Sequence, residues 1–296
     1  MSNETKTHVE CDPSWPTEPL GRIENILTDG CGSVEAWDFS LANSSYEARV
    51  YFVSKVASIC YGNPKSLGSI NLFNRLEAEA AGLPSSSYEF VPVLITKEQF
   101  AKVDLKQCYK FGELVADEQY LLTNLRALIA DVGSEESLNY LNTSEKEIQI
   151  IRDNFKVFLF NVDLPTRSQM VRHRVSWQEL SRRYVSGKRK EFEFYVSDKM
   201  KNVDINFSGK NAEEEKKFDI NINIYEMLIL AESFYNKALE QGVKPEEARR
   251  ILPQAMMTTI WGAFQPTQLD NFFTLRLDSH AQREIRCIAE SMKELI

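Results

Sequence analysis

An arginine-rich segment between Arg167 and Tyr184 is the part of this sequence best suited to chemistry. It reads RSQMVRHRVSWQELSRRY and holds five arginines and one of the chain's three histidines, although the whole chain carries a formal net charge of −8. Arginine, unlike lysine, presents a planar fork of donors that matches a phosphate group. Directional hydrogen-bonding side chains alternate with the arginines: Gln169, Ser176, Gln178, Glu179 and Ser181. The segment predicts a site for a phosphorylated small molecule whose ring also offers donors and acceptors. A basic solvated face is the alternative.

A second cluster lies near the C-terminus, with ARRILP at 248–253 and NFFTLRLDSHAQ at 271–282. If this stretch is one helix, Arg276, His280 and Arg283 fall at i, i+4 and i+7 and share a face. A histidine one turn from an arginine is either a packed structural residue or part of a site. The sequence leaves both interpretations open.

Common catalytic signatures are missing from the sequence. It contains no G-x-S-x-G elbow, no H-E-x-x-H pair and no Walker A loop. Gly30-Cys31-Gly32 lacks a third glycine in register, so a nucleotide cofactor must be held by something other than a Rossmann turn. The five cysteines are scattered without a C-x-x-C pair, so we expect no disulfide framework and no metal site.

The composition limits the class of protein. Of 296 residues, 43% are hydrophobic and 26% charged, the balance of a soluble globular protein. The acidic excess argues against a general nucleic-acid or anionic-membrane binder. No apolar run approaches the roughly 20 residues of a membrane span, and the polar N-terminus lacks the apolar core of a signal peptide. We therefore expect a cytoplasmic protein without nucleic-acid or membrane partners.

Hydrophobic periodicity predicts the elements that must position the two clusters. Residues 1–20 form a polar arm, mobile or draped over the surface. The first half has a helix after a capping box at Ser44–Glu47, a helix over 69–81 stopped by Gly82, and a buried strand over 88–96. Residues 156–164 form a strand that leads into the arginine-rich segment.

The remaining elements are mostly helices. Within the polar segment 97–154 we expect one helix through Leu121 and Val132, and another capped at Ser144. Residues 210–217 form a solvated loop, and 223–239 a strong helix. A short helix begins at Pro245. The C-terminus from 269 to 296 is a long amphipathic helix or a helix pair.

Three blocks of the sequence resemble one known family. RHR at 172–174, followed by SWQELSRRY at 176–184, is similar to the signature of the flavin-dependent thymidylate synthases, whose usual form is RHR and then S-x-N-E-x-S-x-R-Y. ARRILP with Thr258 and Trp261, and NFFTLRLDSHAQREI at 271–285, resemble the same family. Several ordered blocks are more specific than one short pattern. The chain differs in having six residues between Arg174 and Ser181 instead of seven, so it resembles a divergent member.

The resemblance implies a fold and an activity. The fold is mixed α/β (α+β), a central sheet with flanking helices, and not a Rossmann fold. Residues 21–296 form a single domain with an insertion at 97–154. The protein is a homotetramer that binds FAD where subunits meet. It is an FAD-dependent methyltransferase that converts dUMP to dTMP, with methylenetetrahydrofolate as carbon donor and NADPH as reductant.

The resemblance also implies the site residues. Those at FAD are Ser86, Arg172, His173, Arg174, Glu179, Gln265, Asn271 and His280. Those at dUMP are Gln169, Arg172, Glu179, Ser181, Arg182, Arg183, Arg249 and Arg276, with arginines on the phosphate. Arg276 is the catalytic candidate, at the pyrimidine edge, where it favours the N3-ionised form of the ring.

Three other interpretations remain open. The chain is a divergent relative that modifies another pyrimidine nucleotide at C5, a nucleotide-binding homologue without turnover, or a protein whose arginine clusters join subunits.

Overall fold

The computed structural model describes residues 7–27, 30–78, 83–187, 190–210 and 217–296. Its centre is a five-stranded sheet in which every neighbouring pair is antiparallel. The strand order is β1 (Gly21–Glu24), β2 (Ser33–Trp37), β6 (Lys156–Asp163), β10 (Met257–Phe264) and β7 (Ser176–Glu179). The antiparallel sheet with helices on both faces confirms the predicted mixed α/β fold and differs from the parallel sheet of a Rossmann fold.

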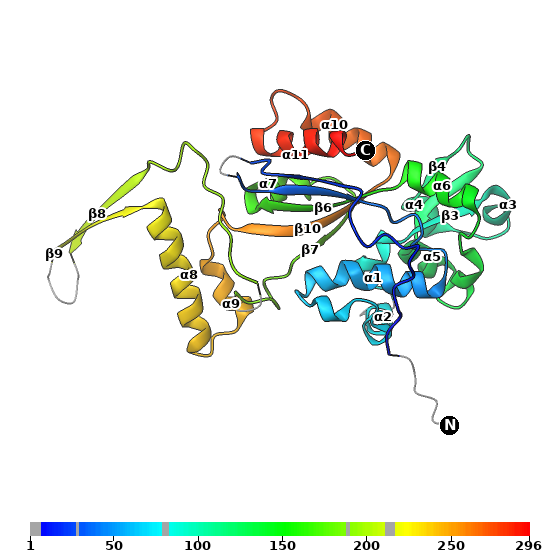
Figure 1. Cartoon of the computed structure of the whole chain (residues 1–296), viewed down its shortest axis with the longest axis horizontal. Coiled ribbons are helices and arrows are strands. Elements are labelled where there is room, and N and C mark those ends of the chain that lie inside the picture. Colours follow the sequence, from blue (N-terminus) through cyan, green and yellow to red (C-terminus); the bar gives the residue numbers. More distant parts are fainter. Residues whose placement is uncertain (1–6, 28–29, 79–82, 188–189, 211–216) are drawn as a thin grey trace.

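The central strand β10 is buried on both faces, since all eight of its residues are buried. Successive side chains of a strand point to opposite faces. Ile260 and Phe264 accordingly pack beneath the C-terminal helix pair, whereas Trp261 and Ala263 belong to the cluster that contains α1. Figure 1 shows the helix pair above the sheet and α1 below it. These helices are α10 (Pro266–Arg276), α11 (Arg283–Glu294) and α1 (Tyr46–Cys60).

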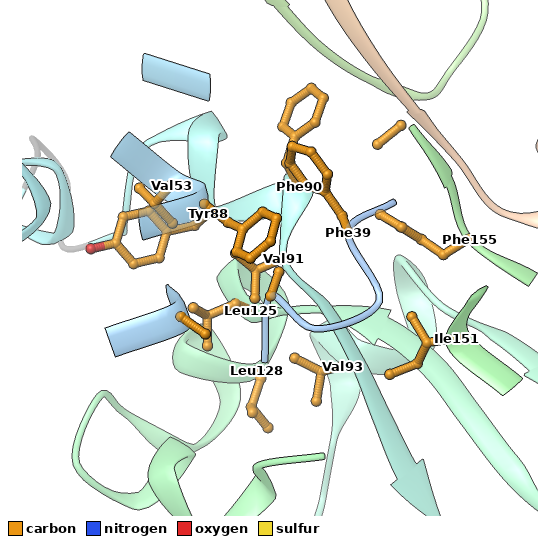
Figure 2. Packing of buried hydrophobic residues seen from close by; sticks show 14 of the residues in the cluster. Phe39, Val53, Tyr88, Phe90, Val91, Val93, Leu125, Leu128, Ile151 and Phe155 are labelled. Carbon is orange, nitrogen blue, oxygen red and sulfur yellow. The ribbon is translucent and has the colours of Figure 1, made fainter. Parts of the chain in front are cut away.

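A second lobe packs against α1. Its three-stranded sheet has the order β3 (Pro92–Thr96), β5 (Tyr120–Asn124), β4 (Glu113–Val115). Side chains from 97–154, such as Leu125 and Ile151, join one hydrophobic core with Val53 of α1 (Figure 2). The other elements of this half are α2 (Ile70–Glu77), η2 (Pro64–Ser66), η3 (Ser86–Phe90), α3 (Lys97–Phe100), α4 (Lys106–Lys110), α5 (Leu125–Val132), η4 (Glu136–Tyr140) and α6 (Glu145–Asn154).

Several predicted elements are confirmed. Ser144 and Glu147 form a capping box at the start of α6. The strand over 156–163 and the C-terminal helix pair are both present. The helix predicted over 69–81 is present as α2, capped by Ser69, but it ends at Glu77 with Ala78 as its C-cap; Gly82, its predicted end, lies outside the described residues.

Other predicted boundaries are wrong for local reasons. The cap of α1 is Ser45, not Ser44, because Ser45 accepts from the backbone of Ala48. The strand predicted from residue 88 begins only at Pro92, after the 3-10 helix η3. The helix predicted through Leu121 begins at Leu125, because Leu121 pairs with Ile95 in a sheet ladder that local spacing cannot reveal.

A hairpin and a long helix lie to one side of the main sheet (Figure 1). The hairpin is β8 (Asp204–Lys210) with β9 (Lys217–Asn223), so the ends of the predicted loop 210–217 pair as strands and residues 211–216 lie outside the described residues. The helix α8 (Ile224–Glu240) buries Leu228 and Tyr235. The remaining elements of the described residues are α7 (Leu164–Met170), α9 (Pro245–Ala248) and η5 (Arg249–Ile251). Across the described ranges, no helix has both the length and the apolar character to span a membrane.

Candidate functional site

A polar cavity of about 550 Å³ lies between α7, the end of β7, η5 and β10. We call it the arginine cavity. Four of the residues predicted to bind dUMP line it: Glu179, Ser181, Arg182 and Arg249. Its size is within the ~300–1,000 Å³ of small-molecule sites. Two sequence blocks almost 70 residues apart thus meet in one hollow.

Glu179 is held in this cavity by two neighbours. It pairs with Ile260 across the β7–β10 ladder, which turns its side chain to the face that carries α7. Arg167 of α7 donates to its Oε2 through Nε, at 2.8 Å, and through Nη2. Thr258 Oγ1 donates to Oε1 at 3.1 Å. An ionised carboxylate accepts about four hydrogen bonds, so Glu179 can still accept a donor from a ligand.

Arg182 forms part of the wall of the arginine cavity. It is 7% exposed, and its Nη1 and Nη2 donate to the carbonyls of Lys190 at 2.9 Å and Glu191 at 3.3 Å. Its guanidinium also lies 4.5 Å from the ring centroid of Phe192. Burial lowers the pKa of this guanidinium. These contacts commit two of its nitrogens to the chain's own backbone.

The exposed cations of the cavity are Arg249 and Arg250. Arg249 Nε donates to the carbonyl of Glu246 at 3.3 Å, and Arg250 Nε pairs with Glu247 at 3.0 Å. Solvent reaches both side chains, so an incoming anion can reach them as well. Ser181 lies nearby and offers a hydroxyl.

Arg276 and His173 form a second polar group, at the end of α10. Arg276 Nε donates to His173 Nε2 at 2.7 Å, and Arg276 Nη2 donates to the carbonyl of Gln169 at 3.0 Å. His173 is 7% exposed and lies 4.7 Å from Phe272 between ring centroids. A guanidinium only donates, so His173 Nε2 must accept and the ring is neutral. Burial, and then the charge of Arg276, lower the pKa of His173 to about 4.

The other predicted residues lie outside the arginine cavity. Gln169, Arg172, Arg183 and Arg276 do not line it. Gln169 Nε2 donates to Gln282 at 2.6 Å, and Arg183 pairs with Glu246 at 3.3 Å. The structure therefore divides the predicted dUMP residues: four line the arginine cavity, Gln169 and Arg276 meet at the end of α7, and Arg183 pairs with Glu246 outside both places.

One spacing argument from the sequence is wrong. Arg276, His280 and Arg283 do not share a helix face, because α10 ends at Arg276 and α11 begins at Arg283. His280 lies in the connecting turn, where its backbone N–H donates to the Asp278 carboxylate at 2.8 Å.

The residues predicted to bind FAD differ in their exposure and in the hydrogen bonds that they already make. Arg172, Arg174, Asn271 and His280 are exposed. Ser86 donates to Gln178 at 2.5 Å. Gln265 is buried and its amide donates to the carbonyl of Phe111 at 2.8 Å, so a contact with flavin requires this bond to exchange. The exposed members fit a large anionic cofactor such as FAD.

In the described part of the chain, no group of three His, Cys, Asp or Glu residues could hold a metal ion.

Sequence reasoning missed several residues that line the arginine cavity. Arg167 belongs to the arginine-rich segment, but its pairing with Glu179 depends on strand pairing that the spacing does not show. Thr258 stood in a matched block without an assigned role. Arg250 is the neighbour of Arg249 in the sequence but was not assigned to the site. No motif in the sequence pointed to Gln254.

Comparison with known proteins gives one consistent family. The profile of the family described as thymidylate synthase complementing protein matches residues 97–296. The flavin-dependent thymidylate synthase of Aquifex aeolicus is 34% identical over 200 residues, which cover 62% of this chain and 59% of that protein. That of Thermosipho africanus is 35% identical over 144 residues, covering 44% and 58%. That of Pyrococcus furiosus is 33% identical over 145 residues, covering 46% and 53%. The chain thus spans somewhat more than half the length of these relatives.

The buried neutral His173 predicts a specific loss of stability in acid. Between its folded pKa of about 4 and its ordinary value of 6.5, the unfolded chain binds more protons than the folded chain. Its contribution is therefore complete above pH 6.5 and is lost as the pH falls toward 4. In urea unfolding at pH 7.5, 5.5 and 4.5, we expect His173→Gln to lose less stability on acidification than the wild type. His8→Gln, at an exposed histidine, is the control and should keep the wild-type dependence. Equal pH dependence of His173→Gln and wild type would contradict the prediction.

Proposed function

This chain belongs to the thymidylate synthase complementing protein family, and from that premise we propose that it is a flavin-dependent thymidylate synthase. It reductively methylates dUMP to dTMP with FAD as cofactor, methylenetetrahydrofolate as carbon donor and NADPH as reductant. The observation that carries the proposal is the arginine cavity, where Glu179, Ser181 and Arg249 come together from separate blocks of the sequence. The relatives named for this activity support it.

In the proposed complex, dUMP occupies the arginine cavity. Arg249 and Arg250 are the exposed cations available to its phosphate, and the Ser181 hydroxyl adds a donor. Glu179 accepts from a ring N–H, because Arg167 and Thr258 already fix its direction. The pocket thus offers donors for the anionic end of the nucleotide and an acceptor for the ring.

FAD, when bound, supplies the hydride that completes the new methyl group. We propose that Arg172 and Arg174 contact its diphosphate, since both are exposed cations beside α10. Gln268 of α10 donates to the carbonyl of Arg174 at 3.1 Å and so holds this loop in place. Asn271 and His280 are exposed on α10 and the turn after it.

The role proposed for Arg276 is to stabilise the negative charge that develops on the pyrimidine ring as its N3–H gives up its proton toward Glu179. Its Nε and Nη2 hold His173 and Gln169, which fixes the plane of the guanidinium. Since Arg276 does not line the arginine cavity of its own chain, we propose that the complete site needs more than one subunit.

We further propose that the protein is a cytoplasmic homotetramer. Helix α8 supports the assembly, because it leaves large apolar side chains open to solvent: Tyr225 at 47%, Ile229 at 63%, Leu230 at 45% and Phe234 at 61% exposed. An exposed apolar face of this extent is typical of a surface that another protein covers.

The experiment that tests the activity is a complete reaction. Purified protein is incubated with FAD, NADPH, methylenetetrahydrofolate and dUMP, and the nucleotide product is identified by mass spectrometry. We expect dTMP. Protein that binds FAD and dUMP but forms no product would instead be a nucleotide-binding homologue. A methylated product from another pyrimidine nucleotide, with dUMP unchanged, would indicate the divergent activity.

Arg174→Ala should release flavin while the chain stays folded. An exposed arginine contributes little packing, whereas its charge opposite a diphosphate contributes to cofactor binding. Flavin per subunit is measured by absorbance after gel filtration, with circular dichroism to check the fold. Arg75→Ala, at an exposed arginine of α2, is the matched control. Normal flavin content in folded Arg174→Ala would refute this role.

Arg276→Ala should separate the two half-reactions. A preorganised charge in a water-poor site contributes about 3–4 kcal/mol to a transition state, so its removal should slow methyl transfer roughly 10²–10³-fold. Reduction of FAD by NADPH should change much less, because it does not involve the pyrimidine. Lysine should rescue poorly, since a point charge does not reproduce the fork. Stopped-flow absorbance measures flavin reduction and dUMP-dependent reoxidation separately. If both steps slow equally, or if neither slows, Arg276 does not act at the pyrimidine ring.

A further inference from the structure

A second cavity lies on the other face of the central sheet. It has a volume of about 440 Å³, and we call it the aromatic cavity because Trp37, Tyr51 and Trp261 line it. Trp261 and Thr258 are three residues apart on β10 and so point to opposite faces. Thr258 lines the arginine cavity. The two cavities share no lining residue within the described chain.

Lys55 of α1 lines the aromatic cavity and is 8% exposed. Its Nζ lies 3.8 Å from the ring centroid of Trp37 and 5.7 Å from that of Tyr51. It donates to the carbonyl of Pro16 at 3.3 Å. No carboxylate of the described residues forms an ion pair with it. Lysine is almost never this buried without an anionic partner, so this cation is available to a ligand.

The electrostatics around Lys55 favour the same conclusion. Burial lowers its pKa to about 8, while Cys11, Glu18 and Glu35 act in the opposite direction. At neutral pH the amine is therefore mostly protonated. A bound anion would offset the cost of keeping this charge out of water.

Trp261 supplies an independent observation at the same cavity. It is 1% exposed, and its indole Nε1 has no hydrogen-bond partner among the described residues. This N–H is itself buried, so Trp261 contributes its ring to the floor of the cavity and does not present a donor to a ligand there.

We propose that the aromatic cavity binds a small planar aromatic carboxylate, with the carboxylate on Lys55 and the ring against Trp37, Tyr51 and Trp261. The rings give the site its preference for a flat apolar body, and Lys55 gives it a preference for an anion. This site lies apart from the arginine cavity, so the proposed ligand site does not depend on the proposed activity.

The N-terminal arm completes the aromatic cavity. Cys11 and Thr17 line it, and Trp15 packs against Tyr51 at 5.1 Å between ring centroids. The backbone of Val9 donates to Gly68 at 2.8 Å. Since the arm is held at several points, the site is formed before a ligand arrives, and little ordering cost opposes binding.

The test uses 1-naphthoate, with neutral 1-naphthylmethanol as its uncharged counterpart. Isothermal titration of the full chain should show saturable binding of one naphthoate per chain. Lys55→Met keeps an unbranched apolar side chain but removes the charge, and should weaken naphthoate binding roughly tenfold or more. Binding of naphthylmethanol should stay within about twofold of the wild type. Lys65→Met, at an exposed lysine of η2, is the control and should bind both compounds as the wild type does.

Two further measurements keep the proposal falsifiable. Lys55→Gln also removes the charge but keeps an unbranched polar side chain, so it should also weaken naphthoate binding, which provides a second variant if Lys55→Met fails to fold. Saturating dUMP should leave naphthoate binding unchanged. The proposal is overturned if the wild type shows no saturable binding, if a folded Lys55→Met or Lys55→Gln protein binds naphthoate normally, or if dUMP displaces it.

Discussion

The ion pair between Arg167 and Glu179 links the elements that form the arginine cavity. It joins α7 to β7, and Thr258 adds β10 to the same carboxylate. Both partners are partly exposed, with side chains 33% and 22% accessible, so the pair adds little to global stability. Its importance is that it fixes the direction of the Glu179 carboxylate. A carboxylate held by three donors keeps one orientation, and a nucleotide ring then meets an acceptor that is already in place.

Helix α7 connects this cavity to the Arg276 group. Its Arg167 side chain reaches Glu179, while the carbonyl of Gln169, two residues later, accepts from Arg276. His173 follows and accepts from the same guanidinium. A change in the position of α7 would therefore move both polar groups together. The two groups nevertheless occupy different places on one chain, and this separation, with the exposed face of α8, underlies the proposal that subunits combine to form the site.

Much of the site could be predicted from the sequence because its chemistry is concentrated in short segments. Glu179, Ser181 and Arg249 were assigned to dUMP from the resemblance of their segments to one family, and they do line one cavity. Long-range pairing explains what was missed. The contact of Arg167 depends on the β7–β10 register, and Arg182 is committed to carbonyls of a later segment. Leu121 was assigned to a helix from the local spacing of apolar residues, which does not show its strand partner Ile95, 26 residues earlier. The insertion predicted at 97–154 stays a prediction, although its side chains share a core with α1.

The most direct test of the central claim is a crystal structure of the protein with FAD and dUMP. The account predicts that the phosphate contacts Ser181 and Arg249, that Glu179 accepts from the ring, and that the Arg167–Glu179 pair is kept. A dUMP molecule bound outside the arginine cavity would contradict it, as would a complex in which Glu179 has turned away from Arg167 and faces solvent.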